Sequence, residues 1–176
     1  MARAYAAILA GPQDHAGQLR QFNLPPSLSA GDAVAQSYAL SELVELAELI
    51  GAPVYAEFVP NTVSFPSSHP LFRGSMIRSA PEARKILDEY DLLFSVGADL
   101  FTLSLPHKTD PMPPGMPLIH LDTDPWQIGK NYPAAAAILG DPKATLPDIT
   151  EATRARMTSG QRGLARERFH DAKEAS

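Results

Sequence analysis

The sequence contains no cysteine among its 176 residues. This absence excludes a disulfide framework and metal sites built on thiolates, and it is typical of a chain in the reducing cytoplasm. A formal net charge of −5 leaves no concentrated basic face, so nucleic acid is not an expected partner. Apolar runs stay well short of the roughly 18 residues that a membrane span requires, and the N-terminal run carries too little charge for a signal peptide. We therefore expect a soluble cytoplasmic protein that contacts neither nucleic acid nor membrane.

The motifs of several enzyme classes are also missing. There is no GxGxxG fingerprint of dinucleotide binding and no GxxxxGK[ST] phosphate loop. Neither HExxH nor a GxSxG elbow occurs, and no two histidines are spaced to bind a metal from one helix. The residues alone therefore identify no catalytic group and no metal ligand.

Helical patterns are present, separated by many of the 17 prolines. They cover residues 39–51, 79–90 and 142–157. The first helix is expected to end at Gly51, and the second begins with a capping box formed by Ser79 and Glu82. Residues 1–30 are irregular, although AYAAIL could open a helix, and the polar tail 158–176 is expected to be frayed.

Short apolar runs between the helices indicate buried strands. They cover residues 52–59, 91–97, 117–121 and 134–140. Their apolar residues are continuous rather than alternating, which is typical of a parallel sheet covered on both faces. The sequence therefore predicts an α/β fold, a three-layer Rossmann-like domain over residues 31–157 with a parallel sheet of about five to six strands.

Three expected strand ends carry residues suited to a ligand. In open parallel sheets, ligands bind beyond the carboxyl ends of the strands. Gly97, Asp122 and Asp141 stand at these ends and are the candidate cofactor-binding residues for ADP, FAD or NAD. The alternative is that Asp124 and Asp141, each followed by a proline, cap helices. We favour capping for each of these two residues taken separately.

The stretch SFPSSHPLFRG, residues 64–74, has neither helical nor strand periodicity and is expected to be an ordered loop. We expect Phe65, Pro66, Leu71 and Phe72 to pin it to the sheet. Arg73 could clamp a phosphate or hold loop carbonyls, of which the second is commoner. His69 in this loop and His107 are the histidines worth testing for function, although a structural role is favoured for His69.

Five segments resemble, in order and in spacing, the central domain of thiamine diphosphate-dependent decarboxylases and carboligases of the acetolactate synthase and benzoylformate decarboxylase types. They are GDAVAQSYALSELVELAELIGAPVYAE, SFPSSHPLFRG, DLLFSVGADLF, PLIHLDTDPWQIGKNYP and ILGDPKATL. Together they extend over about residues 31 to 150.

The resemblance implies a central domain between two others, which supply an activating glutamate and a GDG…N motif for magnesium and the diphosphate. No GDG occurs in this sequence. Thiamine diphosphate and Mg²⁺ are therefore implied for the complete enzyme, and this chain alone is not expected to catalyse. The expected partners are the remaining domains of such an enzyme and further copies of the chain in a homo-oligomer.

Several departures from the family pattern bear on these expectations. The DDR-type stretch that accompanies FAD in some members is replaced by ADLFTLSLP, which disfavours FAD. Ser104 stands where benzoylformate decarboxylases place an active-site histidine, which makes benzoylformate a doubtful substrate. The family's first strand is replaced by PPSLSAGD, in which Ser27 and Ser29 weaken a buried strand.

Two hypotheses lead. The first is a structural central domain of a thiamine diphosphate-dependent enzyme, and the second is a free-standing nucleotide-binding module that uses Gly97, Asp122 and Asp141. A sirtuin-like NAD-dependent deacylase ranks last, because no glycine-rich NAD loop accompanies a candidate histidine.

Overall fold

The computed structural model describes residues 6–10, 40–57, 65–101 and 107–176. Its strands are β1 (Ala6–Ala10), β2 (Val54–Glu57), β3 (Phe72–Met76), β4 (Leu92–Val96), β5 (Leu118–Asp122) and β6 (Ala136–Leu139). Its helices are α3 (Leu40–Ile50), α4 (Ala80–Leu87), α5 (Pro142–Arg156) and α6 (Ser159–Glu174).

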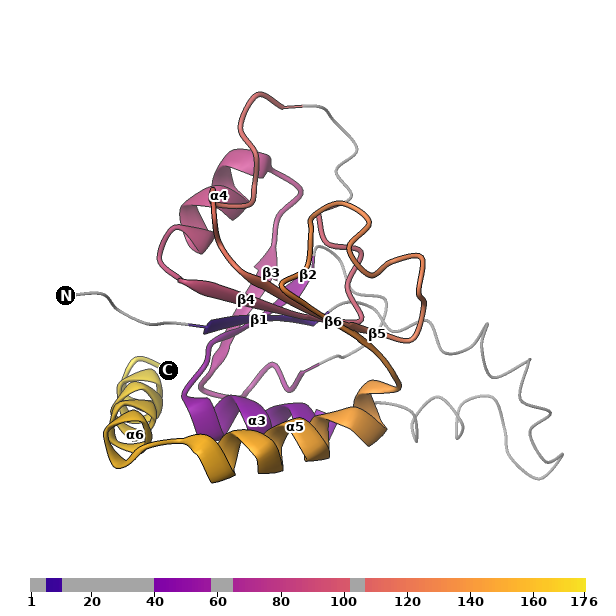
Figure 1. Ribbon diagram of the computed structural model, residues 1–176. Coiled ribbons are helices and arrows are strands. Elements are labelled where there is room, and N and C mark those ends of the chain that lie inside the picture. The colour runs from indigo at the N-terminus through magenta and orange to yellow at the C-terminus, as the bar shows by residue number, and fades with distance from the viewer. Residues whose placement is uncertain (1–5, 11–39, 58–64, 102–106) are drawn as a thin grey trace, which may run out of the picture.

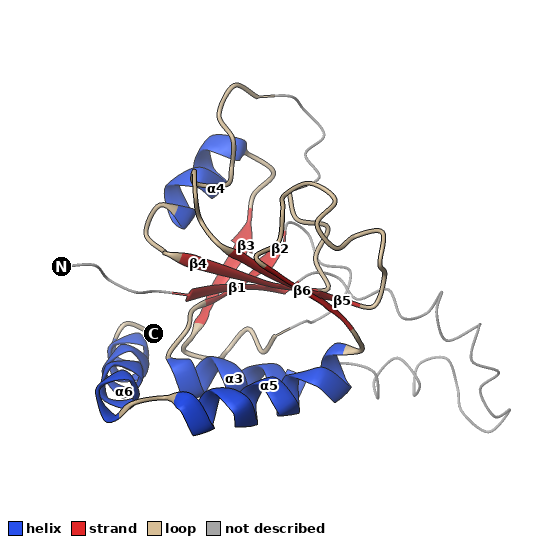
Figure 2. Ribbon diagram, viewed as in Figure 1, coloured by secondary structure: helices blue, strands red, loops and turns tan. Residues whose placement is uncertain are grey.

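The strands form one six-stranded sheet in the order β3-β2-β1-β4-β5-β6, and every neighbouring pair is parallel. Figure 1 shows α4 on one face of this sheet and α3, α5 and α6 on the other. Figure 2 shows loops beside α4 on the first face. The predicted α/β three-layer, Rossmann-like fold with a parallel sheet is confirmed.

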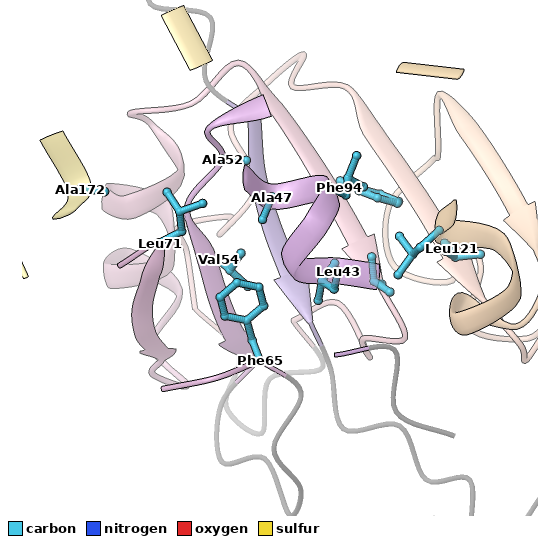
Figure 3. Close-up of a cluster of buried hydrophobic side chains, with 12 residues drawn as sticks. Leu43, Ala47, Ala52, Val54, Phe65, Leu71, Phe94, Leu121 and Ala172 are labelled. Carbon is cyan, nitrogen blue, oxygen red and sulfur yellow. The ribbon is translucent and has the colours of Figure 1, made fainter. Parts of the chain in front are cut away.

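Two apolar cores lie on the two faces. On the α3 and α5 side, Leu43, Val54, Phe94 and Leu121 are buried together (Figure 3). On the α4 side, the core combines strand and helix residues with side chains from the loops that follow β4 and β5. Its members include Met76, Leu87, Leu93, Met112 and Leu118. The continuous apolar strands bury side chains in both cores, as expected for a sheet covered on both faces.

The loop before β3 is pinned as expected. Phe65 and Leu71 are each 2% exposed in the α3-side core, and Phe72 packs against that core. The prediction that the whole stretch to Gly74 is a loop is wrong, because β3 begins at Phe72. This strand alternates partly buried and exposed residues and therefore lacked the continuous apolar signal of the others.

The two ends of the chain also differ from expectation. Residues 6–10, where a helix could have opened, form β1, one of the two innermost strands, since a short apolar run does not by itself distinguish helix from strand. The tail expected to be frayed contains α6, which begins with a capping box between Thr158 and Gln161. The altered first strand at Ser27 and Ser29 lies outside the described residues.

The capping box predicted for α4 is not formed. Ser79 occupies the N-cap position but makes no side-chain cap hydrogen bond. Its amide, which Glu82 would have accepted from in a capping box, donates instead to the carbonyl of Ile77 at 2.7 Å. The start of α4 is therefore fixed by Pro81 in the first turn and by core packing.

Candidate functional site

The carboxyl ends of the parallel strands meet at one edge of the sheet, and the predicted residues lie there. Gly97 follows β4 with φ of +61°, and its amide donates to the carbonyl of Leu121 at 2.9 Å. Asp122 ends β5 and is paired in register with Leu139 of β6. Asp141 lies two residues after Leu139, the last residue of β6. The topology therefore brings Gly97, Asp122 and Asp141 to three neighbouring strand ends.

The carboxylate of Asp122 turns back onto its own chain. It is 7% exposed, and its Oδ1 accepts a hydrogen bond from the amide of Asp124 at 2.8 Å. Burial raises the pKa of Asp122, the Asp124 amide opposes this, and the charges of Asp124 and Asp99 add to the rise. This side chain shapes the turn after β5 instead of projecting into an open crevice.

Asp141 and Asp124 both accept backbone hydrogen bonds. Asp141 is the N-cap of α5, and its Oδ1 accepts from the amides of Lys143 at 2.7 Å and Ala144 at 3.2 Å. The capping role favoured for Asp141 is therefore confirmed. Asp124 accepts from the amide of Trp126 at 2.9 Å in a turn, so it caps that turn and not a helix.

A buried acid at the same edge was not among the predicted site residues. Glu57 ends β2, is 2% exposed, and accepts a hydrogen bond from the amide of Phe101 at 2.7 Å. Burial raises the pKa of Glu57, while the Phe101 amide opposes the rise. The sequence did contain a sign of this site, because Glu57 ends the otherwise apolar strand VYAE. A carboxylate at the end of a buried strand needs a hydrogen-bond partner.

His69 has structural surroundings, whereas Arg73 is exposed. His69 Nδ1 accepts from the amide of Leu71 at 3.2 Å, and its Nε2 lies 3.2 Å from Glu48 Oε1. Its ring stacks on Phe169 of α6 with centroids 5.9 Å apart. This agrees with the structural role favoured for His69, which joins the loop to two helices. Arg73 is exposed on β3.

His107 and His120 lie in different parts of the fold, a loop and β5. His107 is exposed, and its Nδ1 accepts from the amide of Thr109 at 2.9 Å. His120 is 1% exposed in β5, and burial lowers its pKa, which suits a structural residue. Ser104 lies outside the described residues, so its comparison with an active-site histidine stays a prediction.

The described residues do not fit a magnesium diphosphate group. Among them, no three His, Cys, Asp or Glu side chains gather in a way that could hold a metal ion. Together with the absence of GDG from the sequence, this gives the described part of the chain no ligand set for the cofactor of the resembling enzymes. None of the described helices is long and apolar enough to cross a membrane.

Comparison with known proteins identifies the family. Residues 24–149 match the model of the thiamine pyrophosphate enzyme central domain. The chain is 35% identical over 130 residues to an acetolactate synthase of Mycobacterium avium, an alignment that covers 73% of this chain and 21% of that protein. It is 32% identical over 128 residues to a sulfoacetaldehyde acetyltransferase of Castellaniella defragrans, covering 71% of this chain and 21% of that protein.

A solved structure supports the fold. The thiamine diphosphate-dependent 4-hydroxybenzoylformate decarboxylase of Rhodococcus jostii RHA1 superposes with a TM-score of 0.65 at 24% identity. The superposition covers 88% of this chain and 25% of that one. The chain therefore belongs to the thiamine pyrophosphate enzyme central-domain family, and it spans about a fifth of the length of the curated relatives it matches.

Proposed function

We propose that this chain is the central, structural domain of a thiamine diphosphate-dependent 2-oxo acid decarboxylase or carboligase and does not catalyse alone. The observation that carries the proposal is the family match over residues 24–149 in a chain that aligns with only about a fifth of each relative. The domain lies between two cofactor-binding domains, which hold thiamine diphosphate and Mg²⁺, and sets the distance between them. The complete enzyme is a cytoplasmic homo-oligomer.

The surface beside β6 supports contact with those remaining domains. Trp126 is 85% exposed and Leu139 is 63% exposed. Leu139 is the last residue of β6 and pairs with Asp122, the last residue of β5, and Trp126 follows Asp122 by four residues. Large apolar side chains exposed at neighbouring strand ends are candidates for an area covered by another domain. We assign these two side chains to the interdomain contact.

Calorimetry tests whether this chain binds the cofactor without the other domains. Titrating the 176-residue chain with thiamine diphosphate and Mg²⁺ should give no saturable heat, whereas a complete acetolactate synthase should give it under the same conditions. Saturable binding by this chain alone would refute the proposal. A melting shift with ADP or a bound flavin would instead support a nucleotide module built on Gly97, Asp122 and Asp141.

Assembly gives a second test. The chain is co-expressed with a polypeptide that carries the activating glutamate and the GDG…N motif, and complex formation is measured by co-purification. Trp126→Ser and Leu139→Ser should weaken the complex while leaving the melting temperature of the isolated chain nearly unchanged, because both side chains are exposed. An equally stable complex with both variants would exclude this surface.

A further inference from the structure

A tight turn after β4 surrounds the side chain of Glu57. Leu100 and Phe101 both adopt left-handed backbone conformations, with φ of 49° and 60°. Consecutive amide N–H groups in such a turn can converge on one point and form an anion-binding concavity, or nest. Neither residue is a glycine, so surrounding interactions must hold the turn in this unfavourable conformation.

The carboxylate of Glu57 supplies one of those interactions. Its Oε1 accepts from the amide of Phe101 at 2.7 Å. The amides of Leu100 and Asp99 also lower the pKa of Glu57, each by less than the nearby charge of Asp99 raises it. From the carbonyl side of the turn, the Asn131 amide donates to the carbonyls of Asp99 at 3.1 Å and Leu100 at 3.0 Å. The turn is thus held on both sides by side chains from distant parts of the chain.

The second oxygen of this carboxylate is unusual. Glu57 is 2% exposed, and its Oε2 has no hydrogen-bond partner among the residues that the structure describes. A buried oxygen without a partner is costly, so the contacts of Oε1 must compensate for its position. We propose that the amides of residues 99–101 form an anion-binding site whose resident ligand is the Glu57 carboxylate, and that removal of this side chain opens the site to a small free carboxylate.

The proposal predicts that this edge of the sheet binds phosphate poorly. The turn begins two residues after Gly97, at the strand end where a nucleotide would be expected to approach. Amides that already bind Glu57 cannot also bind a phosphate. The charges of Asp99 and Asp122 lie near each other at this edge and oppose a second, more highly charged anion.

Chemical rescue of Glu57→Ala tests the proposal with formate as the probe. Formate at about ten times its dissociation constant should raise the melting temperature of the variant by roughly 3–6 °C beyond the change in sodium chloride of equal ionic strength. Wild type and Asp122→Ala should show no such excess, because Asp122→Ala removes a buried carboxylate but leaves the nest filled. An equal response of all three proteins would overturn the proposal, as would binding of inorganic phosphate to the nest of the wild type.

Amide NMR provides a test that does not depend on the folding of Glu57→Ala. In the wild type, the Phe101 amide proton should shift as Glu57 titrates, and it should be protected from exchange. Glu57→Gln keeps the shape of the side chain and should abolish the titration, while Asp122→Asn should retain it. A Phe101 amide that exchanges freely in the wild type, or that titrates equally in Glu57→Gln, would refute the assignment.

Discussion

Gly51 and Ala165 approach so closely that a Cβ atom on Gly51 would lie 2.5 Å from the carbonyl oxygen of Ala165. Gly51 follows α3 with φ of +63°, and Ala165 is a buried residue of α6. One glycine therefore ends a helix in the left-handed conformation and also allows a second helix to pack against that end.

Gly51→Ala should destabilise the protein strongly. The left-handed conformation alone costs a non-glycine residue roughly 1–3 kcal/mol, and the contact with the Ala165 backbone would add to this by displacing α6. Urea unfolding followed by circular dichroism measures the effect. The control is Gly163→Ala in α6, where an added Cβ meets nothing within 4 Å and should stabilise by about 0.5–1 kcal/mol. A neutral Gly51→Ala would mean that α6 does not pack there.

Thr158 and Ser79 form a matched pair for helix capping. Both stand at N-cap positions, but only the Thr158 side chain accepts a hydrogen bond from the helix, from the amide of Gln161. Thr158→Ala should lower the free energy of unfolding by about 1 kcal/mol, whereas Ser79→Ala should change it by less than about half as much. Thermal melts of both variants check this. A larger loss for Ser79→Ala would contradict the absence of a cap bond at α4.

His69 should matter for stability. His69→Ala removes the acceptor for the Leu71 amide and the stacking on Phe169, which together should cost about 1–3 kcal/mol. His69→Phe should recover part of this loss, because an aromatic ring can still stack. Denaturant unfolding gives the comparison, with His107→Ala as the exposed control expected within about 0.5 kcal/mol of the wild type. A neutral His69→Ala would leave room for a functional role.

The raised pKa of Asp122 predicts a pH dependence. Its ordinary value is 3.8, and burial raises it in the folded state, so the folded protein holds this proton more tightly than the unfolded chain. The stabilising contribution of the protonated form is complete below 3.8 and is lost as pH rises through the folded-state pKa. Asp122→Asn imitates the protonated form. Its stability relative to wild type should therefore increase from about pH 3 upward and level off once the pH exceeds the folded-state pKa of Asp122, as measured by urea unfolding at each pH. A relative stability that falls with pH would show a lowered pKa.

The sequence predicted the fold class because β2, β4 and β5 are buried on both faces. The expectation of a buried strand at 134–140 is wrong in its burial, because β6 lies at the edge of the sheet and is largely exposed. Runs such as DLLFSV carry no alternation, and the helices between them end at clear signals such as Gly51. Two strands were missed for a physical reason. β3 lies at a sheet edge and has a mixed pattern, and residues 6–10 are too short a run for periodicity to decide between helix and strand.

The candidate site was predicted in position but not in detail. Gly97, Asp122 and Asp141 lie at neighbouring strand ends, as topology requires, yet whether they hold a cofactor stays a prediction. Glu57 was missed because its partner is a turn 44 residues away in sequence. Local sequence patterns do not show which backbone amides, from residues far away in the sequence, the fold will place around a side chain.

The position of β1 affects how far this protein can be truncated for expression. β1 pairs with β2 on one side and β4 on the other, and residues 6–10 precede the family match that begins at residue 24. An excised polypeptide of residues 24–149 would therefore lack the strand that joins β2–β3 to β4–β5–β6, and it would lack α6 as well. The hydrogen-bonded sheet extends beyond the homologous segment, so expression boundaries for this protein should follow the sheet and not the alignment.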